Sequence, residues 1–100
     1  MKKGGSVYIM TNILHSVLYT GVTSDLIKRV QQHKYKFYQH SFTTKYNVTV
    51  LVYHQFYPTI IEAILEEKRI KGGNRKQKTE LINSMNPNWE DLWEKEVRFW

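Results

Sequence analysis

Few residues in this chain have the types and spacing that catalysis requires. No serine or threonine stands in a local signature of a nucleophilic triad. The chain contains no cysteine, which excludes disulfides, thiolate zinc sites and cysteine nucleophiles. It also has no glycine-rich phosphate loop, and none of its four histidines is spaced i, i+4 from another.

The acidic residues narrow the possible metal chemistry. Asp25 is the only carboxylate in the first half of the chain, whereas a two-metal nuclease site needs several that converge. One carboxylate, together with basic residues, phenols and a histidine, would still suffice for a phosphodiesterase that uses a single metal ion.

The charge distribution indicates a polyanionic partner. The 100 residues include 15 Lys+Arg and nine Asp+Glu, for a net charge of +6. No acidic residue occurs between Leu26 and Ile61, and a second basic cluster extends from Lys68 to Lys78. Clustered positive charge on a small domain favours nucleic acid as the partner, although such charge can also serve solubility alone.

The length and hydropathy predict one soluble domain over residues 1–100. No stretch of about 18 apolar residues could span a membrane. The amino-terminal residues lack the apolar stretch of a signal peptide, so we expect a cytoplasmic protein.

Apolar patterning predicts the elements that must position any site. Strands are expected at residues 6–11 and 17–22, joined as a hairpin, and at residues 46–56. A helix capped by Thr23 or Ser24 should run to about residue 38, with the polar residues 39–45 as a connection. Pro58 and the pair Gly72-Gly73 delimit a helix over residues 60–71. Further helical segments are expected at 74–84 and 89–100.

These elements predict an α/β (α+β) fold. Its three-stranded, mainly antiparallel sheet would be flanked by helices, in the order β-β-α-β-α-α-α. The aromatic residues between Tyr35 and Tyr57 are expected to lie mostly in the core rather than to form a surface for base stacking.

Two tyrosine motifs carry a family resemblance. Ser6-Val7-Tyr8 is followed after ten residues by Tyr19-Thr20-Gly21, which resembles the paired motifs of the GIY-YIG nuclease family. The resemblance continues through Asp25-Leu26, Lys28-Arg29-Val30 and His33, and later through Glu67-Lys68 and Asn86-Pro87. Most similar is a branch of small stand-alone bacterial proteins related to the amino-terminal nuclease module of UvrC.

The resemblance implies a DNA endonuclease, with a role in repair or recombination, that uses one Mg²⁺ or Mn²⁺ ion. Tyr8 and Tyr19 would share a pocket, and Tyr8 would activate the attacking water. Arg29 would stabilise charge on phosphorus, and His33 would deprotonate water or orient a tyrosine. Glu67 matches the metal ligand, and its neighbour Glu66 stays an alternative.

The same resemblance suggests how a nucleic acid is bound. Candidate backbone contacts are Lys68, Lys71, Arg75, Lys76, Lys78 and Asn86. Val22 stands where several family members have a lysine, and His33 could take part of that lysine's role. A binding module with little hydrolytic activity, a partner protein that supplies specificity, and RNA as the substrate all stay open.

Overall fold

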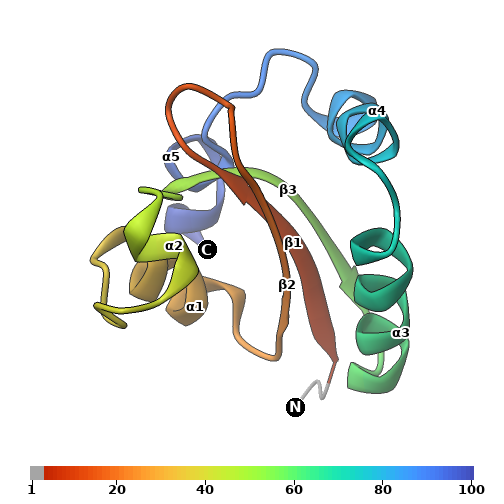
Figure 1. Ribbon diagram of the computed structural model, residues 1–100. Helices are drawn as coiled ribbons and strands as arrows, with labels where there is room; N and C mark the ends of the chain where they lie inside the picture. The colour runs from red at the N-terminus through yellow and green to blue at the C-terminus, as the bar shows by residue number, and fades with distance from the viewer. Residues whose placement is uncertain (1–3) are drawn as a thin grey trace.

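The structure is a computed structural model that describes residues 4–100. A three-stranded antiparallel sheet forms its centre (Figure 1). Met1, Lys2 and Lys3 lie outside the described residues, so the expected domain is described only from Gly4 onward. Strand β1 (Gly5–Thr11) lies in the middle, between β2 (Leu18–Thr23) and β3 (Val50–Tyr57). Both pairings are antiparallel, so β2 and β3 form the two edges. The predicted fold class is confirmed.

Helices cover both faces of this sheet. On one face lie α1 (Leu26–Lys34), α2 (Phe42–Lys45), α5 (Leu92–Lys95) and the 3₁₀ helix η1 (Val97–Phe99); on the other lie α3 (Ile60–Lys71) and α4 (Arg75–Met85) (Figure 1).

The alternation of β1 produces two cores. Tyr8 and Met10 pack in the core beneath α1, and Val7 and Ile9 pack in the core beneath α3. This is why β1 has no polar face: both of its sides are covered.

Helix α1 begins and ends differently from the prediction. Its N-cap is Asp25, whose carboxylate accepts a hydrogen bond from the Lys28 amide, and not Thr23 or Ser24. It ends at Lys34 and not near residue 38. Lys36 adopts a positive φ of 52°, and the Phe37 amide donates to the Gln32 carbonyl, which completes a Schellman motif.

The segment expected to be a polar connection contains the short helix α2. Ser41 caps its first turn by accepting from the Thr44 amide. Asn47, with φ of 55°, ends it, and the Val48 amide then donates to the Thr43 carbonyl. Because Asn47 is left-handed, residues 46–49 do not join the strand, and β3 begins at Val50.

The expectation that the aromatic residues after α1 lie in the core is wrong. Tyr35 is 80% exposed, and this surface also includes Phe37, Tyr38, Phe42 and Tyr46. The early end of α1 turns this segment outward, away from the sheet. Tyr53 on β3 is buried as expected.

The two long helices of the second half follow the prediction closely, whereas the helical segment expected at residues 89–100 contains only the short helices α5 and η1. Helix α3 has the expected bounds, and α4 begins and ends one residue later than predicted. Gly72 occupies the C-cap of α3 with φ of −76°, so it ends the helix without a left-handed conformation. In the described part of the chain, no helix has the length and apolar character needed to span a membrane.

Candidate active site

The hairpin places Tyr8 and Tyr19 on one face of the sheet. Tyr8 pairs with Gly21, and Tyr19 pairs with Met10, so alternation directs both side chains toward α1. Their ring centroids are 6.3 Å apart. Tyr8 is 1% exposed, whereas Tyr19 is half-buried at the edge of the sheet.

Gly21 makes room for the Tyr8 ring. A β-carbon at position 21 would lie 2.5 Å from both Cζ and Oη of Tyr8, well inside van der Waals contact. The ring therefore crosses edge strand β2 where a side chain would otherwise be. This contact gives a physical reason for the glycine two residues after Tyr19.

We expect Gly21→Ala to destabilise the protein by about 1–3 kcal/mol, the usual cost of overpacking a core. Urea unfolding, monitored by circular dichroism, measures this loss of unfolding free energy. Gly72→Ala is the matched control, because its β-carbon would approach no atom closer than 3.4 Å. Equal stability of the two variants would contradict this account of Gly21.

His33 joins the two tyrosines from α1. Its Nε2 lies 2.9 Å from the Tyr8 hydroxyl, and its Nδ1 lies 3.1 Å from Oγ1 of Thr43. The imidazole centroid is 5.7 Å from the Tyr8 ring and 5.4 Å from the Tyr19 ring. With 7% exposure, His33 is a buried member of this cluster and not a surface histidine.

Burial and neighbouring charge set the protonation of this cluster. Burial raises the pKa of Tyr8 far above its usual value, and Tyr19 adds to the rise. Arg29 acts on Tyr8 in the opposite direction. Burial, with Arg29 beside it, lowers the pKa of His33 to about 4. At neutral pH, Tyr8 is therefore a phenol and His33 a neutral imidazole.

Glu66 and Glu67 have different surroundings. Glu66 Oε1 accepts from Arg69 Nε at 2.7 Å, and hydrogen bonds from Arg69 and Tyr57 lower the pKa of this carboxyl. Glu67 instead acts on the phenol of Tyr8 from α3, since its charge contributes to the raised pKa there. The charge of Glu67 therefore acts on Tyr8, whereas the charge of Glu66 acts on Tyr53 and Tyr57.

The donor set around Glu67 fits a hard divalent cation bound by one protein carboxylate. The Glu67 side chain is 12% exposed and forms an i,i+4 ion pair with Lys71, whose Nζ lies 3.6 Å from its Oε2. Residues 4–100 contain no group of three or more His, Cys, Asp or Glu side chains that could hold a metal. Mg²⁺ bound through one carboxylate, with water and phosphate oxygens, needs no such group.

A hollow of about 320 Å³ runs beside this cluster, along the edge of β2. Tyr19 and Phe42 line it from the α1 side, and Lys71 and Lys78 line it from the α3 side. The two helical layers thus meet at this edge, with phenol and aromatic groups opposite two cations.

The other basic residues that were predicted to contact the nucleic acid lie on α3 and α4, partly outside this hollow. Lys68 and Lys78 line a larger cleft, of about 710 Å³, between α3 and α4. Lys76 is exposed on α4. Arg75 donates to the backbone carbonyl of Ser16 at 3.2 Å and also to that of His15, so it secures the β1–β2 turn.

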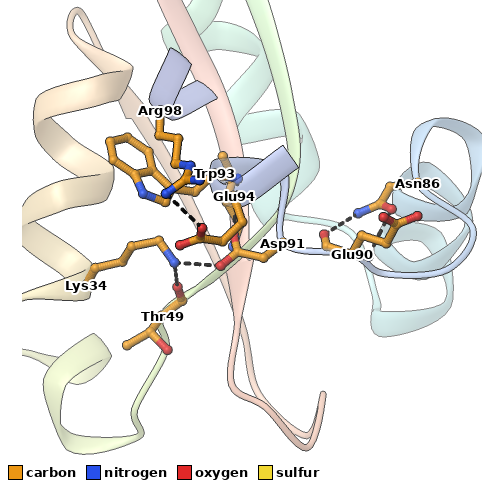
Figure 2. Close-up of polar contacts among 9 residues, drawn as sticks. Lys34, Thr49, Asn86, Glu90, Asp91, Trp93, Glu94 and Arg98 are labelled. Carbon is orange, nitrogen blue, oxygen red and sulfur yellow. Dashed lines mark hydrogen bonds and ion pairs between the residues drawn. The ribbon is translucent and has the colours of Figure 1, made fainter. Parts of the chain in front are cut away.

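Asn86 is buried in the core and does not line the hollow. It is 4% exposed, and its Nδ2 donates to the carbonyls of Val52 and Glu90, as Figure 2 shows for Glu90. Its Oδ1 accepts from the Glu90 amide at 3.0 Å. This amide group holds the end of α4, so the expected phosphate contact of Asn86 finds no support here.

One basic residue of α1 is also structural. Lys34 Nζ lies 2.6 Å from Asp91 Oδ2 and 2.8 Å from the Thr49 carbonyl (Figure 2). Asp91 Oδ1 in turn accepts from the amides of Leu51 and Trp93. Lys34 thus fastens α1 to β3 and the carboxyl-terminal segment.

Sequence reasoning missed two side chains of α2 that contact the cluster. Thr43 binds His33 as described, and the Phe42 ring stacks on Tyr19 with centroids 6.3 Å apart and planes at 28°. A helix of one turn has no hydrophobic period. The available signals were Ser41, which is its N-cap, and Asn47, the left-handed residue that follows its C-cap Tyr46.

Comparisons with known proteins identify the family and the fold of this chain. The family model described as the GIY-YIG catalytic domain matches residues 4–80. The solution structure of the UPF0213 protein BH0048 from Bacillus halodurans is similar in fold, with a TM-score of 0.57 and 24% identity. That match covers 94% of this chain and 98% of the other. Among curated proteins, no sequence matches this chain. From the match over residues 4–80, the chain belongs to the GIY-YIG nuclease family.

Proposed function

We propose that this protein is a metal-dependent endonuclease that hydrolyses DNA phosphodiester bonds in the cytoplasm, in DNA repair or recombination. One observation carries the proposal: the hydrogen bond between Tyr8 and His33 lies beside a cationic hollow, within reach of the charges of Arg29 and Glu67. General-base, cationic and carboxylate groups are the parts that phosphodiester hydrolysis with one metal ion requires.

Tyr8 and His33 act together on the attacking water. A free phenolate at Tyr8 is costly because burial raises its pKa. The phenol oxygen therefore takes a proton from water as its own proton passes to Nε2 of His33. The new O–P bond forms with an electron pair of water as the P–O bond to the leaving sugar oxygen breaks, and this oxygen leaves with the bonding pair and takes a proton from solvent. The proton given up by Tyr8 resides on the imidazole. The neutral state of His33 leaves it able to accept this proton.

Arg29 and Glu67 would stabilise the negative charge that this step creates on the phosphate oxygens. Arg29 is a fixed cation for the additional charge on the phosphorane oxygens. Glu67 would hold the divalent cation, which when bound supplies Lewis-acid stabilisation of phosphate oxygens.

DNA would lie along the edge of β2. Lys71 and Lys78 offer phosphate contacts in the hollow, with Lys68 and Lys76 beyond it on α3 and α4. These contacts make binding depend on salt. Phe42, at 49% exposure, presents a ring to the same hollow.

We expect Glu67→Ala to abolish metal-dependent nicking of DNA. The assay compares supercoiled, branched and single-stranded DNA with Mg²⁺ or Mn²⁺. Glu66→Ala is the matched control, because it removes a carboxylate of the same helix that is bound by Arg69. It should retain cleavage.

Three results would count against these assignments. Loss of cleavage in Glu66→Ala alone would move the metal to Glu66. Equal cleavage by all three proteins would indicate a contaminating nuclease. Tight, salt-sensitive DNA binding without cleavage by the wild type would make this chain a binding module.

A further inference from the structure

The hydroxyl groups of α2 form one continuous chain of contacts with the candidate active site. Its links are Tyr8 Oη to His33 Nε2 (2.9 Å), His33 Nδ1 to Thr43 Oγ1 (3.1 Å), Thr43 Oγ1 to Ser41 Oγ (3.1 Å), Ser41 Oγ to Thr44 Oγ1 (3.2 Å), and Thr44 Oγ1 to the Tyr38 carbonyl (2.7 Å).

Proton counting gives this chain a direction. The Tyr38 carbonyl has no proton, so Thr44 must donate to it. A hydroxyl has only one proton to donate, so the contact between Ser41 and Thr44 must be donated by Ser41. For the same reason, Thr43 donates to Ser41.

The direction decides the tautomer of His33. Since Thr43 uses its proton on Ser41, its oxygen can only accept from His33, which places the ring proton on Nδ1. A neutral imidazole with a proton on Nδ1 has a bare Nε2. Tyr8 therefore donates to Nε2.

We propose that Thr43 is a positioning residue that holds His33 in the Nδ1–H tautomer and thereby aims a bare Nε2 at Tyr8. The catalytic consequence rests on the proposed nuclease function. With the other tautomer, Nε2–H would donate to Tyr8, and the phenol could not pass its proton to the ring. Thr43 is 4% exposed, so water does not readily replace it.

The tautomer can be read without any cleavage assay. Nitrogen-15 chemical shifts distinguish a protonated from a bare ring nitrogen, and His33→Gln identifies the His33 signals by their loss. The full-length wild type at neutral pH should show a protonated Nδ1 and a bare Nε2. A protonated Nε2 in the wild type would overturn the proposal.

Two substitutions then separate positioning from packing. Thr43→Val keeps the shape of the side chain but removes the acceptor, so the proton should redistribute toward Nε2 and cleavage should fall about 10- to 100-fold. Thr43→Ser keeps the hydroxyl, and we expect the wild-type tautomer and most of the activity. Wild-type cleavage and tautomer in Thr43→Val would reject the role.

Thr11→Val is the matched control for a lost buried hydroxyl. Thr11 is fully buried on β1 and donates to the Val17 carbonyl at 2.7 Å. This variant should lose stability without changing the His33 spectrum. If Thr43→Val does not fold, the wild-type and Thr43→Ser spectra still decide the tautomer. If no DNA is cleaved even by the wild type, the nuclease proposal fails while the spectra test the tautomer independently.

Discussion

Arg29→Ala is expected to reduce DNA cleavage by about 10³-fold or more while it weakens DNA binding only modestly. The charge of the guanidinium acts on both Tyr8 and His33, the groups that would activate water. Its stabilisation of a phosphorane is greatest when charge builds on phosphorus. Single-turnover cleavage and fluorescence anisotropy measure the two effects separately.

Lys76→Ala is the control for this prediction. Lys76 is an exposed cation on α4 and does not line the hollow at the edge of β2. Its loss should reduce affinity and the salt dependence of binding, with little change in single-turnover rate at saturation. If Arg29→Ala changes cleavage no more than Lys76→Ala does, Arg29 is only another phosphate contact.

The same variant has a second readout, in the titration of His33. Burial and the Arg29 charge together hold the pKa of His33 at about 4. Removal of the guanidinium should therefore raise this pKa, and proton NMR of the imidazole follows it in the free protein. An unchanged titration would show that Arg29 does not act on His33.

Tyr8→Phe is the second large effect that we expect. It removes the oxygen that would accept the proton of water, so cleavage should fall by about 10²- to 10⁴-fold, the range for general-base catalysis. It also leaves Nε2 of buried His33 without its partner, at a cost of about 1–3 kcal/mol in unfolding free energy. Single-turnover kinetics and urea unfolding measure these losses.

Tyr53→Phe tests whether a buried tyrosine hydroxyl matters in general. Tyr53 lies on β3 in the core beneath α3, with 6% exposure and a pKa that burial raises above its usual value. We expect this variant to cleave DNA at close to the wild-type rate. If Tyr53→Phe and Tyr8→Phe lose cleavage equally, the effect of Tyr8→Phe comes from destabilisation and not from a role in catalysis.

Local pattern was enough to predict the sheet and the two long helices of the second half. Runs of β-branched and aromatic residues define β1 and β2, and a proline and a glycine pair delimit α3. The family motifs predicted a shared site for five residues: Tyr8, Tyr19, Arg29, His33 and Glu67. Their placement follows from the period of two in the hairpin and from i, i+4 spacing between Arg29 and His33 on α1.

The cores and the roles of several polar residues depended on contacts between distant segments. Asn86 and Arg75 resemble candidate phosphate ligands in the sequence, but each binds carbonyls that arrive from elsewhere in the chain. The different surroundings of Glu66 and Glu67 also depend on the fold. One residue turns a helical side chain by about 100°, so Glu67 acts electrostatically on Tyr8 while its neighbour Glu66 binds Arg69.

The sequence by itself therefore determined the family, the sheet and the residue types of the candidate site. The tertiary structure decided which of those residues meet. In the fold, α1 ends at Lys34, the aromatic segment beyond it is exposed, and Thr43 of α2 contacts His33, which lies ten positions earlier in the chain. The physical reason is that a helix of one turn is too short to be stable by itself, so packing against the rest of the fold stabilises it. A hydrogen bond to a buried imidazole likewise depends on a partner from a distant segment, which the residues around His33 in the sequence do not indicate.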